Sequence, residues 1–90
     1  MLERDVTISN KLGLHARASA KLVQLLQGFP SCNAWLIHRG REVNAKSIMG
    51  VMMLAAGVGS TITLRTDGDN ESAAMDALVD LFNRKFDEGA

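Results

Sequence analysis

The most constraining feature of this 90-residue chain is that strand and helix periodicities alternate along it with only short connections. In the segment Thr61 to Thr66, polar and apolar residues alternate as far as Arg65, as they do in a half-buried strand. Apolar residues recur at helical spacing from Ala16 to Gln27 and from about Glu71 to Phe86. Together the patterns predict strands at 5–8, 32–38, 41–44 and 61–66, and helices at 16–27, 47–56 and 71–86.

The order of these elements, β-α-β-β-α-β-α, predicts an α+β fold. The short turn at Arg39-Gly40 indicates an antiparallel hairpin. An antiparallel four-stranded sheet with three helices on one face buries the apolar sides of all seven elements economically. In the second strand we expect Ala34 and Leu36 to face the core and Trp35 to face outward. Because no linker or repeat interrupts the chain, we expect a single domain over residues 1–90.

Composition narrows the class of protein. A hydrophobic fraction of 47% with 22% charged residues is typical of a packed globular core. The formal net charge of zero argues against general nucleic-acid binding, which depends on an excess of Lys and Arg. The charged N-terminus does not resemble a secretory signal, and no apolar run reaches membrane-spanning length. With Cys32 as the single cysteine, no intramolecular disulfide can form, and we expect a soluble cytoplasmic protein.

The segment Gly13-Leu14-His15-Ala16-Arg17 lies where a loop becomes the first helix. The first N–H groups of a helix have no partner within it, and its macrodipole places partial positive charge there. A neutral imidazole at that point is a nucleophile facing an anion site, and Arg17 adds a forked cation. The pattern favours a site that carries a phosphoryl group on His15. A histidine that merely caps the helix is the alternative.

The second predicted helix combines a cap with an apolar surface. Ser47 is a typical N-cap residue. The following residues are apolar nearly all round, so a short helix cannot bury every side. We expect Ile48, Val51 and Ala55 to share one stripe, with Met49, Met53 and part of Met52 exposed. These methionines either fill gaps in the core or form a docking surface that adapts to several partners, and we favour docking.

Two further expectations concern charge and metal. Lys11, Arg17, Lys21 and Lys46 are predicted to create a positive field around His15 that would steer acidic partners. His38 lies in the hairpin without a nearby set of ligands, so no metal site is expected.

Two motifs resemble one known family. Gly13-Leu14-His15-Ala16-Arg17 resembles the phosphorylation motif of the HPr family, the histidine-containing phosphocarriers of the bacterial phosphotransferase system. Asn44-Ala45-Lys46-Ser47-Ile48-Met49-Gly50 is similar to that family's regulatory serine segment. The resemblance covers essentially the whole chain and implies the family fold, an open-faced β-sandwich. Ala18 stands where many members have proline, which puts the rigidity of the helix start in doubt.

The resemblance implies a specific relay. His15 would be phosphorylated on Nδ1 by enzyme I, with phosphoenolpyruvate as the original donor, and would pass the group to an enzyme IIA component. Arg17 would bind the phosphate and assist transfer, and the amides of Ala16 and Arg17 would face it. Such a carrier is a stoichiometric relay without a cofactor rather than a turnover enzyme. The residues predicted to dock its partners are Leu14, Ile48, Met49 and Met52.

Several alternatives stay open at this point. Ser47 is either a plain cap or a target of the HPr kinase/phosphorylase. The chain is a carrier or a regulatory binding module, and it serves either sugar uptake or the nitrogen-related branch. The segments 52–56 and 86–89 look like proteobacterial members, including the nitrogen-related type, which we favour slightly. An RNA-binding α/β domain is a remote rival, because paired strand aromatics are missing. A carrier that alternates between partners is expected to be a monomer.

Overall fold

A computed structural model describes residues 1–88 of the chain. Its strands are β1 (Leu2–Thr7), β2 (Cys32–His38), β3 (Arg41–Asn44) and β4 (Thr61–Gly68). Its helices are α1 (Ala16–Leu26), α2 (Ile48–Met53) and α3 (Glu71–Asn83), followed by a 3₁₀ turn η1 (Lys85–Asp87). The strands form one antiparallel sheet in the order β1-β4-β2-β3. The end of the predicted domain, at residues 89 and 90, lies outside the described residues.

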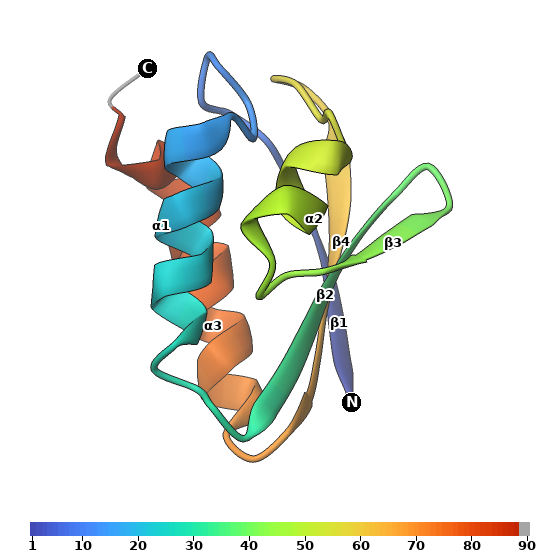
Figure 1. Cartoon of the computed structure of the whole chain (residues 1–90), viewed down its shortest axis with the longest axis vertical. Coiled ribbons are helices and arrows are strands. Elements are labelled where there is room, and N and C mark those ends of the chain that lie inside the picture. Colours follow the sequence, from blue (N-terminus) through green and yellow to red (C-terminus); the bar gives the residue numbers. More distant parts are fainter. Residues whose placement is uncertain (89–90) are drawn as a thin grey trace.

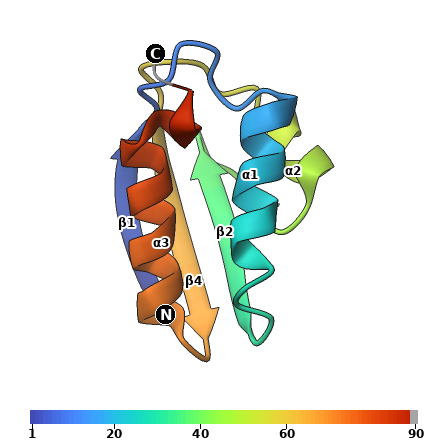
Figure 2. The same cartoon turned by 90° about the vertical axis from the view of Figure 1, so that its left-hand side faces the viewer.

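The helices cover one face of the sheet and leave the other face open (Figure 1), so the predicted open-faced β-sandwich is confirmed. Figure 2 shows α1 and α3 side by side in front of the strands, with α2 next to the upper half of α1. Along residues 1–88, no helix has both the length and the apolar composition that crossing a bilayer would require.

The core confirms the alternation predicted for the strands. Ala34 and Leu36 of β2 are buried, and Trp35 between them is half-buried on the open face. The buried side chains of the sheet meet those of the helices in one cluster that includes Ile62, Leu64, Leu22, Leu26, Leu78 and Phe82. Each leucine or phenylalanine buried in this way stabilises the fold by about 1.5–3 kcal/mol.

The second helix is shorter than predicted, because it ends at Met53 rather than Ala56. Ala55 adopts a left-handed backbone with φ of +51°, which turns the chain toward β4. The buried side chains here are those of Val51 and Leu54, while Ile48 and Ala55 are exposed. The stripe expected from Ile48 through Ala55 was therefore wrong, since Ala55 lies beyond the helix in a left-handed conformation and Leu54 is buried instead.

The third helix also ends early, at Asn83 rather than Phe86. Lys85, Phe86 and Asp87 have φ values of +55°, +53° and +60°, so the chain reverses in η1. Phe86 is fully buried and packs edge-on against Phe82, with ring centroids 4.8 Å apart. Lys21 of α1 donates to the Phe86 carbonyl oxygen at 2.7 Å. These two contacts hold η1 beside α1.

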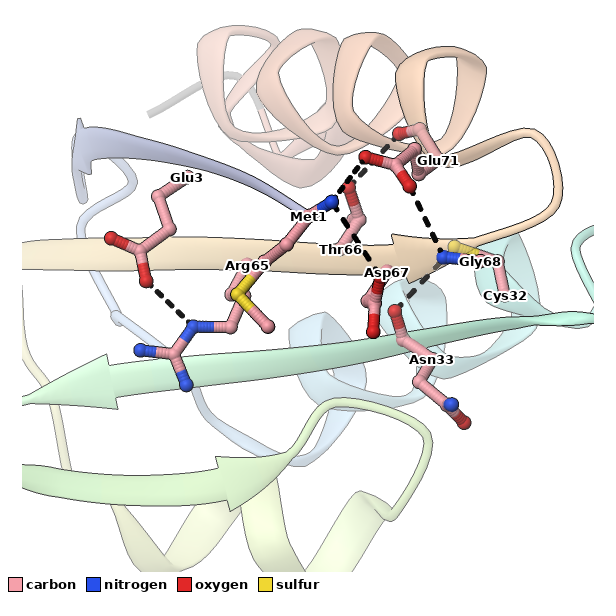
Figure 3. A network of polar contacts seen from close by, with 9 residues as sticks. All are labelled: Met1, Glu3, Cys32, Asn33, Arg65, Thr66, Asp67, Gly68 and Glu71. Atoms are coloured by element: carbon pink, nitrogen blue, oxygen red, sulfur yellow. Dashed lines mark hydrogen bonds and ion pairs between the residues drawn. The ribbon is translucent and has the colours of Figure 1, made fainter.

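A polar network holds the first strand at the opposite end of the sheet (Figure 3). The Met1 ammonium lies 2.8 Å from a carboxylate oxygen of Glu71 and 3.5 Å from Asp67. Glu71 also accepts the Gly68 N–H at 3.3 Å. The hydrogen bond from the Met1 ammonium, with that from Gly68, holds the pKa of Glu71 below its usual value despite the opposing effect of burial. The network ties β1 to the turn between β4 and α3.

Candidate functional site

His15 is the N-cap residue of α1. Its backbone is extended (φ −74°, ψ −179°), and its carbonyl oxygen accepts the Ser19 N–H at 2.9 Å. Its Nδ1 accepts the Arg17 N–H at 3.3 Å, as the side-chain oxygen of a serine or aspartate cap would do. The unshared electron pair of Nδ1 therefore faces the helix N-terminus, where the sequence predicted an anion site.

Gly13 allows the loop before His15 to lie directly against the connection between α2 and β4. Its φ is +66°, and a Cβ placed there would lie 2.6 Å from the Ala56 oxygen and 2.9 Å from Gly57 Cα. The next residue, Leu14, donates its N–H to the same Ala56 oxygen at 3.1 Å. Close backbone packing thus fixes the position from which α1 begins.

Leu14 does not belong to a docking surface, contrary to the prediction. It is only 5% exposed and lies in the hydrophobic core. The hydrogen bond of its N–H to Ala56 turns its side chain inward, while His15 beside it faces solvent. Leu12, which sequence reasoning did not single out, is the exposed leucine of this loop.

A shallow pocket beside His15 gathers positive charge. Its lining includes Lys11, Leu12, Arg17, Lys21 and Glu88. The Arg17 side chain is exposed and forms no ion pair with any residue from 1 to 88. A guanidinium in this state is available to an incoming anion.

Lys46 does not contribute to this positive field, which corrects the prediction. Its Nζ donates to the Phe29 carbonyl oxygen at 2.9 Å, just beyond the C-terminal end of α1. His15 caps the other end of that helix, so Lys46 points away from it.

Residues 1–88 bring together no three His, Cys, Asp or Glu side chains able to hold a metal ion.

Glu88 completes the site, and sequence reasoning missed it. The His15 Nε2–H donates to one oxygen of the Glu88 carboxylate, and Asn10 Nδ2 donates to the other at 3.0 Å. Asn10 is fully buried and also donates to the Gly13 oxygen at 2.8 Å. The contact between Asn10 and Glu88 joins residues 78 positions apart, so no local sequence pattern indicates it.

The Glu88 carboxylate is held in its charged form. Burial acts to raise its pKa, but the hydrogen bonds from Asn10 and His15 and the positive charge of Lys21 outweigh burial, so the pKa lies below its usual value. A charged carboxylate at Nε2 requires the proton on that nitrogen, which leaves Nδ1 unprotonated in the neutral ring. The tautomer assigned in this way leaves the electron pair of Nδ1 free of a proton.

The second helix presents an apolar surface next to α1, which we call the α2 surface. It consists of Ile48, Met49, Met52 and Met53, all of them exposed, with Met49 the most exposed at 69%. Ser47 caps this helix through its hydroxyl oxygen, which accepts the Gly50 N–H at 3.1 Å. The exposure expected for the methionines is therefore present.

Comparison with known proteins gives one consistent result. A family model described as "PTS HPr component phosphorylation site" matches residues 2–84. The phosphocarrier protein HPr of Cupriavidus necator is 64% identical over 89 residues, 99% of each chain. The phosphocarrier protein NPr of Shewanella violacea is 45% identical over 89 residues, 99% of this chain and 97% of that one. The crystal structure of HPr-C-His from Thermoanaerobacter tengcongensis superposes with a TM-score of 0.92 at 45% identity, covering 98% of both chains.

Proposed function

The chain belongs to the HPr family of phosphocarrier proteins of the bacterial phosphotransferase system, and we propose that His15 is the residue on which it carries the phosphoryl group. The observation that carries this proposal is the placement of His15 Nδ1 at the N-terminus of α1, 3.3 Å from the Arg17 N–H. The N-cap residues of α1, α2 and α3 are His15, Ser47 and Asn70, and among these side chains the imidazole is the strongest nucleophile at neutral pH.

In the proposed loading step, the Nδ1 electron pair forms a bond to phosphorus while the bond between phosphorus and the donor breaks. The Arg17 N–H is then released from Nδ1 to a phosphoryl oxygen, beside the N–H of Ala16. The Arg17 guanidinium supplies the cation. Phosphoryl transfer requires mainly positioning and neutralisation of charge on the equatorial oxygens, and these groups provide both.

The donor in this proposal is phosphorylated enzyme I, and the acceptor is an enzyme IIA component. Both meet a docking surface made of Ile48, Met49 and Met52 together with Leu12. Since both partners use one face in turn, the carrier works as a monomer.

Met49→Asp should slow transfer with both partners, because it places a charge in an apolar contact. Asn33→Asp, which adds the same charge on an exposed strand position elsewhere, is the matched control.

The first test is phosphorylation itself. The protein is mixed with enzyme I, Mg²⁺ and phosphoenolpyruvate and its mass is followed, with His15→Ala and His38→Ala as paired variants. We expect one acid-labile phosphate on the wild type and on His38→Ala, and none on His15→Ala. Absence of phosphate from the wild type would contradict the carrier role and favour a regulatory binding module.

The second test identifies the branch. The relative named HPr is 64% identical and the relative named NPr is 45% identical. The phosphorylated protein is therefore offered separately to a sugar-type and a nitrogen-type enzyme IIA, and the rates of phosphoryl loss are compared. Transfer to neither acceptor would contradict the proposed relay.

Phosphorylation of Ser47 by an HPr kinase/phosphorylase is the regulatory part of the proposal. The Ser47 hydroxyl lies at the start of α2, beside the α2 surface, and its side chain is half-buried. A phosphate there would add negative charge next to the contact with partners. Incubation with the kinase and ATP should modify the wild type and leave Ser47→Ala unmodified; an unmodified wild type would exclude this regulation.

A further inference from the structure

We propose that Glu88 is a positioning residue for His15, which keeps the proton on Nε2 while Nδ1 gains and loses the phosphoryl group. This inference rests on the proposed function, since it concerns the same imidazole. It adds a role for a carboxylate at the far end of the chain.

The geometry gives each ring nitrogen a different partner. Nδ1 accepts from the Arg17 N–H, whereas Nε2 donates to Glu88. The carboxylate cannot swing freely, because its second oxygen accepts from the buried Asn10 amide at 3.0 Å. Asn10 is itself anchored by its bond to the Gly13 oxygen at 2.8 Å. The loop that positions His15 and the carboxylate that faces it are therefore held together.

The chemistry of both steps depends on the Nε2 proton. In loading, the Nδ1 electron pair forms the bond to phosphorus and the ring, still protonated on Nε2, becomes cationic. A carboxylate hydrogen-bonded to that N–H stabilises the cation. In unloading, the electron pair of the N–P bond returns to Nδ1 and a neutral imidazole leaves. Without the Nε2 proton the leaving group would be an imidazolate anion, which departs far less readily.

The surroundings favour a charged carboxylate at this point. Lys11, Arg17 and Lys21 flank the pocket into which Glu88 faces. Asp87 also borders this pocket, but its carboxylate pairs with Arg84 at 2.7 and 2.8 Å. The pKa of Glu88 lies below its usual value, so the carboxylate stays ionised at neutral pH. The buried Phe86 fixes the turn from which Glu88 extends.

The test compares the wild type with Glu88→Ala, Glu88→Gln and the charge-matched control Asp87→Asn. Without any phosphorylation, ¹⁵N-edited NMR measures exchange of the His15 Nε2–H with water. We expect exchange to accelerate about tenfold or more in Glu88→Ala and to stay unchanged in Asp87→Asn. Equal exchange in Glu88→Ala and the wild type would overturn the proposed contact.

The second measurement uses protein loaded by enzyme I and then separated from it, and follows phosphoryl loss to water at pH 7. Because the carboxylate stabilises the cationic ring from which the phosphoryl group leaves, its removal should slow this loss in Glu88→Gln. The glutamine retains a hydrogen-bond acceptor, so this variant separates charge from mere contact. An unchanged rate would refute the positioning role. A wild type that cannot be loaded would instead refute the proposed function, and the exchange measurement would still decide the Glu88 contact.

Discussion

Gly13→Ala tests whether the loop that presents His15 depends on backbone packing against Ala56. The added Cβ would lie 2.6 Å from the Ala56 oxygen and 2.9 Å from Gly57 Cα, and neither backbone atom can rotate away. At φ of +66°, an alanine costs about 1–2 kcal/mol relative to an unstrained residue. Moving the loop to relieve the contact would break the bond from the Leu14 N–H, and an unpaired buried donor costs about 1–3 kcal/mol.

The expected loss in the free energy of unfolding is thus about 2–5 kcal/mol. For a domain of this size each kcal/mol corresponds to about 4–8 °C in Tm, so a fall of at least about 8 °C should be seen by circular dichroism. Gly40→Ala is the matched control, because Gly40 has φ of +80° but a Cβ added to it would meet no atom within 4 Å. Equal losses in the two variants would refute the packing argument, since strain alone would then explain both.

Three further predictions concern the rest of the chain. Ser47→Ala should lose about 1 kcal/mol in urea unfolding through loss of the cap on the Gly50 N–H, and undiminished stability would contradict that cap. Ala18→Pro should raise stability by about 0.4–1 kcal/mol, because the third residue of α1 has no partner for its N–H within the helix; a lower Tm would contradict this. The pKa of Glu71 is lowered by the Met1 ammonium, so the unfolded chain binds more protons in acid, and stability should fall as pH drops through the folded-state pKa. Glu71→Gln should flatten that fall in a pH series of melts, and an unchanged slope would count against the contact.

The sequence predicted the fold correctly in those segments where the pattern of apolar residues alone determines the secondary structure. The alternation of β4 and the helical spacing of α1 each reflect burial of one face, so the sheet and its helical layer were predicted correctly. The early ends of α2 and α3 were not predictable in this way. Ala55 and Phe86 adopt left-handed backbones without being Gly or Asn, and Phe86 does so because its ring packs on Phe82. Such ends are set by tertiary contacts rather than by local signals.

The candidate site shows the same difference between features set by local sequence and features set by tertiary contacts. The placement of His15 and Arg17 at a helix start was predicted correctly, because both lie within one turn of it, where spacing determines geometry. The contact of His15 with Glu88 joins positions 73 residues apart and depends on the reversal of the chain in η1. Lys46 was placed wrongly because spacing along the chain does not reveal which way a long side chain points.

The exposure of His15 has a consequence for how partners act. Its side chain is 28% exposed beside a shallow pocket, so in the proposed function the carrier alone would leave a phosphoryl group on His15 open to water. Electrostatic stabilisation of transfer is strongest where water is excluded, and in the proposed function a docked partner would provide that exclusion. The α2 surface would then act only in the complex. Met49→Asp should therefore slow transfer to and from partners while leaving the loss of phosphate to water unchanged. A parallel change in both rates would show instead that the substitution disturbs His15 itself.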